Sequence, residues 1–334
     1  MSKKRLAIYI SVSVLITFII FCVALMVGQY KISLGSFFKA VFTSDESVNM
    51  ERSIIINLRL PRTILAALTG IALSLSGLIY QDVFQNKLTS PDLLGVSTGA
   101  SVGAAIAILL GLSSVFISVF AFIAGVATVL ITVGLAKLFK NGHTITLIFS
   151  GIIVGGFMSA ILSFIKFLSD PTTTLATITM WLMGSFQNAT MNQIYILGPI
   201  VAVSAVFLIL YSFRMNVVAL GRDEAQTKGV NYKVARLLLI GVATLLTATS
   251  VAFCGVVSWI GLVIPHLVRL LVGRQNERTI PLAIFIGATF MIIVDIISRV
   301  FTKQEMPLSA VTGLLGTVLF VAIVLIKRRS KHVS

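Results

Sequence analysis

Apolar runs of about twenty residues recur along the whole chain, and they leave few folds open. A helix needs about twenty apolar residues to cross roughly 30 Å of hydrocarbon. Of the 334 residues, 57% are hydrophobic and only 11% are charged, whereas a soluble domain carries about a quarter charged residues. A backbone inside a bilayer must pair its own N–H and C=O groups, which favours helices. The sequence therefore predicts an all-α integral membrane protein, with residues 1–334 forming a single polytopic domain.

A window of this length predicts about ten membrane spans. Longer connections are expected at about residues 28–63 and 165–193 on one side, and at about 214–233 on the other. The third span is short, and only Cys254 and Gly255 separate the seventh from the eighth, so a hairpin or re-entrant break is expected there. The spans run approximately over residues 6–27, 64–80, 96–110, 115–135, 145–164, 194–213, 234–253, 256–272, 280–297 and 308–326.

The lysines and arginines orient the predicted bundle. With the N-terminus inside, about 18 of them fall on the inner side, as the positive-inside rule requires of cytoplasmic loops. Both termini are therefore predicted to be cytoplasmic. The net charge of +15 follows mostly from this bias, and since the charges form no single stripe, no nucleic-acid partner is expected. Cys22 and Cys254 lie in separate apolar runs and are expected to be packing residues, and no metal site is predicted.

Some basic residues stand on the outer side against this bias. Arg59 and Arg62 precede the second span, and Arg299 ends the ninth. They could receive an acidic partner. Alternatively, Arg59 and Arg62 snorkel from a helix end and Arg299 pairs with Asp295 one turn back. Exposed ion pairs are worth only about 0.2–1 kcal/mol each, so the residues alone leave both readings open.

The eighth span contains unusual residues for a membrane helix. Gly261, Pro265, His266 and Arg269 interrupt its apolar run. A charge or a lost backbone hydrogen bond is tolerated in hydrocarbon only where it faces protein, a water-filled cavity or the interface. His266 and Arg269 stand three residues apart and share a helix face. Because no carboxylate or nucleophile converges with them in the sequence, a structural or interfacial role is favoured over a catalytic one.

Three further segments stand out. Residues 81–100, which include Gly95 and Gly99, are polar and rich in helix breakers, which predicts a bent path into the membrane. Residues 170–185 predict a short interfacial helix anchored by Trp181. In the inner loop, Gly221 and Gly229 bound a short charged stretch, which predicts a surface helix between two turns. That helix could dock into a soluble partner or could simply be a solvated connector.

Taken together and in order, several motifs resemble those of the FecCD-type permeases of ABC importers, which carry ferric siderophores, haem or vitamin B12. The resemblance covers essentially the whole chain. It implies a type II ABC importer permease bundle that works as a permease dimer, with two cytoplasmic ATPase subunits and an extracytoplasmic binding protein. The motifs are Arg59–Leu60–Pro61–Arg62, residues 81–100 with Leu94–Ala100 at their core, Trp181–Ser185, Leu220–Gly229, Gly261–Arg269, and Glu305–Pro307 followed by Thr312–Gly313.

The resemblance implies roles for particular residues. Arg59, Arg62 and Arg299 would meet acidic residues of the binding protein. The Leu220–Gly229 loop, which contains Gly221 and Ala225, would seat on the ATPase. Because glycines bound this loop, we further expect Ala225 to lie where a larger side chain would clash with the ATPase groove. The translocation path would follow the dimer axis, lined largely by the fifth and tenth spans.

These features predict an importer permease of the bacterial cytoplasmic membrane that is not itself an enzyme. The chain has no Walker-type Gly-x-x-x-x-Gly-Lys-Ser/Thr sequence, so it is expected to bind no cofactor directly and to depend on ATP used by its partner. A ferric siderophore is the expected substrate, with haem or vitamin B12 as alternatives, and the second permease subunit is identical or homologous. A secondary transporter or channel would need an ionisable residue at the midplane or a broken-helix ion site. Asp82 and Asp295 lie near span ends, and the fifth and tenth spans lack carboxylates.

Overall fold

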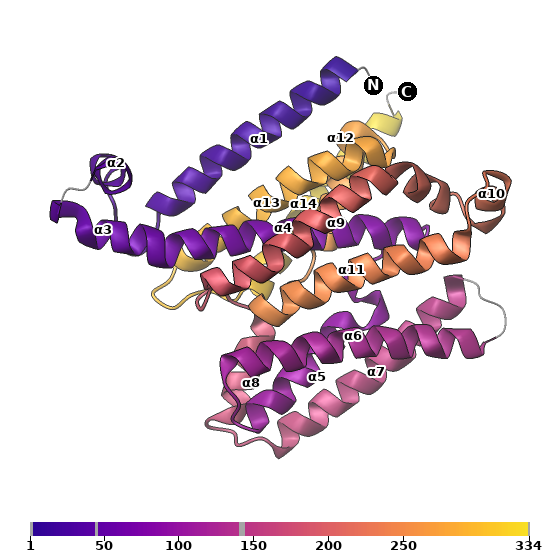
Figure 1. Cartoon of the computed structure of the whole chain (residues 1–334), viewed down its shortest axis with the longest axis horizontal. Coiled ribbons are helices and arrows are strands. Elements are labelled where there is room, and N and C mark those ends of the chain that lie inside the picture. The colour runs from indigo at the N-terminus through magenta and orange to yellow at the C-terminus, as the bar shows by residue number, and fades with distance from the viewer. Residues whose placement is uncertain (1–2, 44–45, 140–143, 333–334) are drawn as a thin grey trace.

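The computed structural model describes residues 3–43, 46–139 and 144–332, and side chains as far as residue 325. The regular secondary structure of these residues is helical throughout (Figure 1). Eight helical segments are long and apolar enough to cross a membrane. They are α1 (Lys3–Met26), the continuous stretch Asn49–Val83 that ends in α4 (Leu60–Val83), α6 (Ser114–Leu138), α7 (Thr144–Leu168), α9 (Met191–Val218), α11 (Tyr232–Cys254), α13 (Asn276–Val300) and α14 (Leu308–His332).

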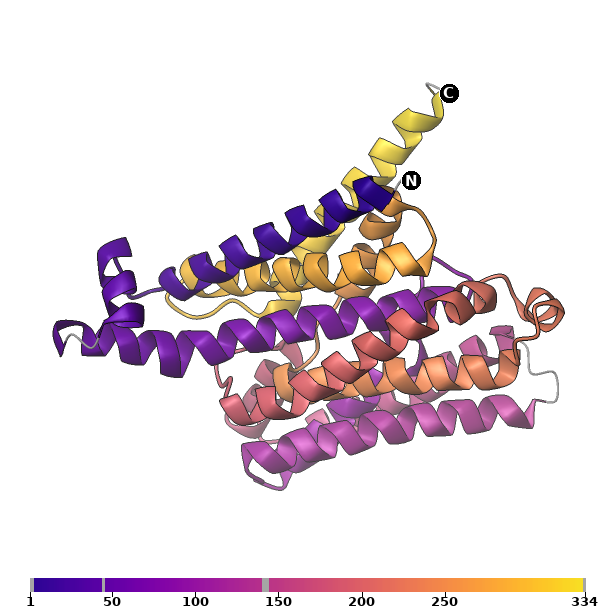
Figure 2. The ribbon, with the colours of Figure 1, turned by 45° about the horizontal axis from the view of Figure 1, so that its top comes forward.

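Two shorter apolar helices, α5 (Val96–Leu109) and α12 (Ile260–Val272), account for the remaining predicted spans. Every predicted span therefore corresponds to a helix, and the all-α membrane fold is confirmed. We call the end of the bundle that carries α10 (Arg222–Thr227) the inner end and the opposite end the outer end, after the orientation that the charge pattern predicts. The start of α1 and the end of α14 lie at the same end of the bundle in both ribbon views (Figures 1 and 2).

The connection between α1 and α4 extends beyond the bundle at the outer end (Figure 1). It contains α2 (Leu34–Phe42), the 3-10 turn η1 (Glu46–Val48), α3 (Asn49–Ser53) and the π-helical segment η2 (Ile54–Arg59). The wider π turn ends at Arg59, two residues before Pro61. Since proline has no N–H to donate and its ring crowds the preceding turn, this change of helix type lets one helix continue through Pro61.

Helix α4 lies at the centre of the bundle. It packs against α9, α11, α12 and α13, and Figure 2 shows it running between α13 and α9. Its small residues make these contacts close: Gly70 faces the backbone of Gly287 on α13, and Gly77 faces the backbone of Gly261 on α12. Small residues let membrane helices approach where no hydrophobic effect drives them together. The spacing of Gly70 and Gly77 thus marks a genuine helix interface.

The two short helices are short because irregular backbone precedes each of them. Before α5, the 3-10 turn η3 (Pro91–Leu94) leads into Gly95, whose φ of +82° is one that residues with a Cβ resist. Residues 255–259 likewise precede α12. Both breaks are largely covered by protein, although the Trp259 side chain is exposed, and the two meet where Gly261 contacts the ring of Pro91. The Thr132 hydroxyl donates to the Leu94 carbonyl at 3.1 Å, so the freed backbone is partly satisfied by the bundle itself.

The expected short outer helix is present as α8 (Thr174–Met183), and Trp181 packs against the bundle. Asp170 begins the turn that leads into it. The N–H and hydroxyl groups of Thr172 and Thr173 all donate to the Asp170 carboxylate, at 2.7 to 2.9 Å. These hydrogen bonds stabilise the ionised form and hold the pKa of Asp170 below its usual value.

The packing of α4 predicts opposite effects at two glycines. A Cβ at residue 77 would overlap the carbonyl of Gly261, whereas Gly134 in α6 has nothing within 4 Å of the same position. We expect Gly77→Ala to cost about 1–3 kcal/mol through overpacking. Gly134→Ala should be neutral or gain up to about 1 kcal/mol from helix propensity. Thermal unfolding of both variants in detergent tests this, and equal midpoints would contradict the close α4–α12 contact.

Candidate functional site

A buried cluster of charges lies at the outer end of the bundle. The Arg62 Nε donates to Asp295 Oδ1 at 2.6 Å, and Arg62 also pairs with Glu305. Asp295 is fully buried, and its other oxygen lies 3.4 Å from the Arg299 Nε. Because a carboxylate in low dielectric is costly without a partner, the two arginines on either side of Asp295 stabilise its charge. The cluster joins α4, α13 and the segment that leads into α14.

Arg59 serves a different part of the fold. Its guanidinium donates to the carbonyls of Leu25 at 2.9 Å and Met26 at 2.6 Å, and the Arg299 Nη2 donates to the Ala24 carbonyl at 2.6 Å. The last carbonyls of a helix have no partner within that helix. Arg59 and Arg299 therefore cap the C-terminal end of α1 and tie it to the bundle.

The three arginines expected to dock a binding protein are thus buried, between 5% and 8% exposed, and engaged by the chain itself. The alternative expectation that Arg299 pairs with Asp295 is confirmed, whereas Arg59 and Arg62 turn inward and do not snorkel. Docking through these side chains stays a prediction. The exposed cations at this end are others, among them Lys31 and Lys39.

A second buried polar cluster lies at the inner end. The Arg269 Nη2 donates to Asp82 Oδ1 at 2.6 Å, and the Arg269 Nη1 donates to Gln81 Oε1 at 2.8 Å. The Asn276 side chain donates to the other Asp82 oxygen at 2.7 Å, and its backbone N–H donates to the Asn216 Oδ1 at 2.8 Å. Four helices, α4, α9, α12 and α13, meet in this network. Its α9 member lies just before the loop that contains α10.

This network supplies the buried partner of Arg269, the charged residue of the eighth predicted span. From the sequence, no carboxylate converged on His266 and Arg269, but the fold brings Asp82 onto Arg269 from 187 residues away. Asp82, Asn276 and Asn216 gave no local signal because their partners are distant in the chain. His266 faces the opposite neighbour: its ring lies 5.7 Å from that of Phe320 on α14. A structural role for both residues agrees with these contacts.

Pro265 and Gly261 also act together. Proline cannot donate the helical hydrogen bond to the carbonyl four residues earlier, so the Gly261 carbonyl is left without that partner. This carbonyl lies directly against Gly77 of α4. The pair therefore brings α12 and α4 into backbone contact. Gly99 likewise allows close approach of α5 and α6, because a Cβ there would meet Thr128 of α6.

The inner loop has the predicted helix between two glycine turns. Gly221 and Gly229 have φ values of +108° and +70°, and α10 lies between them. One expectation needs correction: the Ala225 side chain is fully buried within this chain and does not face outward. A larger residue there would clash with this chain's own core. The surface that α10 presents comes instead from Asp223, Glu224 and other exposed residues, and Leu220 is exposed beside it.

The inner network predicts a stability effect. Arg269→Gln would leave Asp82 buried with its charge uncompensated, which typically costs about 3–5 kcal/mol. We expect a lower thermal unfolding midpoint and lower yield in detergent. Asp223→Asn, an exposed carboxylate at the same end, is the matched control and should change neither. A wild-type midpoint for Arg269→Gln would show that the ion pair contributes nothing.

Comparison with known proteins places this geometry in a family. The model of the FecCD transport family matches residues 16–326. The chain is similar to the molybdate import system permease MolB of Haemophilus influenzae, with 33% identity over 89% of each chain. It is similar to the cobalamin import system permease BtuC of Halobacterium salinarum, with 36% identity over 79% of this chain and 71% of the other. It is also similar to the hemin transport system permease HmuU of Yersinia pestis, with 30% identity over 83% of this chain and 84% of the other.

The similarity extends to three dimensions. A solved structure described as an inward-facing conformation of a metal-chelate type ABC transporter superimposes with a TM-score of 0.86 at 31% identity, covering 95% of this chain and 98% of that one. The resemblance that the motifs indicated is confirmed, and so is the assignment as a permease rather than an enzyme. The chain belongs to the FecCD transport family and is a multi-pass permease subunit of an ABC importer.

Proposed function

We propose that this permease moves a ferric siderophore into the cytoplasm, fed by an extracytoplasmic binding protein. Haem and vitamin B12 are the alternative chelates. The names of the relatives include molybdate, cobalamin, hemin and iron chelatin. The proposed substrate therefore depends on the side chains that this chain exposes along the proposed path.

The observation that carries the proposal is the apolar surface of α7 and α14. Exposed large side chains on α7 include Phe149, Ile153 and Phe157, and those on α14 include Leu314 and Val318. Residues 144–165 and 308–325 contain no charged side chain. A bare metal ion or a small oxyanion needs charged or polar groups to replace its water. A chelate wraps its metal in organic groups and presents a large, partly apolar surface, which a path of this kind can pass without holding.

Some of the partners follow from the family to which the chain belongs. An ABC permease of this family implies a second permease subunit and ATPase subunits, and we propose that α7 and α14 line the path between the two permeases. We further propose that the inner end is cytoplasmic in a bacterial membrane, with both termini on that side, and that the exposed face of α10 seats on the ATPase. ATP is then used by that subunit, and no cofactor binds this chain.

At the outer end we propose a binding-protein dock with two layers. Arg59, Arg62 and Arg299 hold α1, α4 and α13 in place from inside. Exposed cations above them, including Lys31 and Lys39, meet acidic groups of the binding protein. Such rim charges act mainly on association rates and are screened by salt.

The substrate proposal is tested with the permease, its ATPase and its binding protein in proteoliposomes. We expect uptake of a ferric siderophore, with no competition from excess molybdate. If only haem or cobalamin is taken up, that chelate is the substrate instead, and uptake of molybdate would overturn the proposal of a chelate.

The docking proposal is tested at the exposed lysines of the outer end. Lys31→Glu with Lys39→Glu should slow capture of loaded binding protein, more at low than at high salt, and leave folding unchanged. Lys137→Glu with Lys233→Glu, at the inner end, is the control.

The coupling proposal is tested at α10. Asp223→Lys with Glu224→Lys should weaken ATPase co-purification about tenfold, because both side chains are exposed on the surface proposed to face that subunit. Binding-protein capture should persist. Lys303→Glu, an exposed change at the outer end, should leave ATPase association intact. If the α10 variant keeps wild-type ATPase association and substrate-stimulated hydrolysis, the loop is only a connector.

A further inference from the structure

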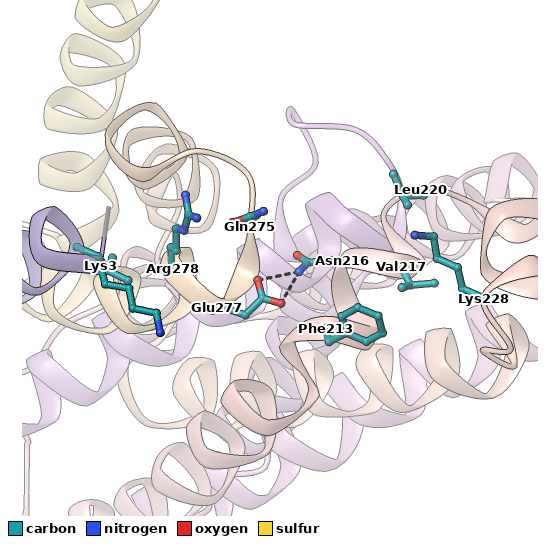
Figure 3. A pocket seen from close by; sticks show the side chains of 10 residues that line it. Lys3, Phe213, Asn216, Val217, Leu220, Lys228, Gln275, Glu277 and Arg278 are labelled. Carbon is teal, nitrogen blue, oxygen red and sulfur yellow. Dashed lines mark hydrogen bonds between the residues drawn. The ribbon is translucent and has the colours of Figure 1, made fainter. Parts of the chain in front are cut away.

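A cavity of about 430 Å³ opens at the inner end (Figure 3), and its described lining residues include none from α7 or α14. The first turns of α1, the last turns of α9 and the start of α13 form its walls, together with residues on both sides of α10. Two of these helices are largely uncovered by the rest of the chain, since 0% of the apolar window of α1 and 22% of that of α9 is buried. The cavity lies at the inner ends of these two spans.

The charges around this cavity are not balanced. Lys3, Lys228 and Arg278 line it, and none of their side chains forms an ion pair or a side-chain hydrogen bond with the described residues. Glu277 is the acidic residue of the lining. Its two oxygens accept hydrogen bonds from the Asn216 side chain at 2.7 and 2.8 Å, as the dashed lines in Figure 3 show. The described lining of the cavity therefore carries a net positive charge, and the part of the chain that the structure describes supplies no counter-ion for it.

The remaining wall of the cavity is apolar. Leu6 and Phe213 line it, and Phe213 is 63% exposed. Beyond the cavity the apolar surface continues along α9, through Leu210 and Val206, which share a helix face with Phe213 and are both exposed. Cations at the mouth with an apolar surface running into the membrane match a molecule that has an anionic head and a hydrocarbon tail.

We propose that this cavity binds one anionic phospholipid, with its anionic head group in the part of the cavity that Lys3, Lys228 and Arg278 line and an acyl chain lying against Leu6 and Phe213. Inorganic phosphate or a nucleotide would satisfy the cations but would leave the apolar wall unused. A zwitterionic lipid brings its own ammonium group and would not neutralise the excess charge. The lipid would join α1 to the end of the α10 loop, beside Asn216, where the inner network ends.

The test uses the purified full-length permease in detergent, titrated with fluorescent phosphatidylglycerol. The variant Lys3→Gln, Lys228→Gln, Arg278→Gln should bind it at least about tenfold more weakly, since each cation near a membrane surface contributes appreciably to anionic lipid binding. Its control, Lys137→Gln, Lys233→Gln, Arg222→Gln, removes the same charge from exposed positions that do not line the cavity. Phe213→Glu should weaken binding by itself, because it places a carboxylate on the apolar wall.

Competition identifies the ligand. Unlabelled phosphatidylglycerol should displace the probe, whereas phosphatidylcholine and inorganic phosphate should not. All variants should keep the wild-type unfolding midpoint, because the changed side chains are partly or fully exposed. Equal affinity of the cavity variant and its control would overturn the proposal. So would displacement by inorganic phosphate, which would indicate a soluble anion. Loss of ATPase association with unchanged lipid binding would assign the cavity to that partner instead.

Discussion

Helix α4 is held at each end by a buried ion pair, and the arrangement of the bundle follows from that constraint. At its outer end Arg62 pairs with Asp295 of α13, and at its inner end Asp82 pairs with Arg269 of α12. A charge away from water is tolerated only with a partner in good geometry, so sliding α4 along either neighbour would break a pair. Between the two pairs the contacts are made by small residues, Gly70 and Gly77 among them. The ion pairs thus specify the position of α4, and the glycines allow its close approach.

The two broken spans are the second feature that depends on this centre. Irregular backbone at membrane depth is acceptable only inside protein. The breaks before α5 and α12 meet each other, through Pro91 and Gly261, and the second of these residues lies against α4. Together, α4 and the two breaks form a part of the bundle where backbones approach one another closely.

Polar chemistry is therefore concentrated at the two ends of the molecule, and the uncovered faces of α7 and α14 between them are apolar. This division agrees with the proposed passage of a bulky chelate along α7 and α14, with energy conversion left to the ATPase subunits. The inner network reaches from Arg269 to Asn216, close to the α10 loop, and the outer cluster reaches Glu305, just before α14. Each end thus links the core to a segment through which a partner is proposed to act.

The sequence by itself determined the number, order and approximate limits of the spans, because hydropathy over twenty residues is a local property. It also predicted the turns at Gly221 and Gly229 and the short helix α8, and it offered the pairing of Arg299 with Asp295 as one of two alternatives. Its motifs were sufficient to indicate the family. What only the tertiary structure decided was which distant residues meet. Asp82 pairs with Arg269, Arg59 points inward and caps α1, and the Ala225 side chain is buried within the chain instead of lying on its surface. These outcomes depend on how whole helices pack, and no local pattern of charge or size around each residue encodes its partner on another helix.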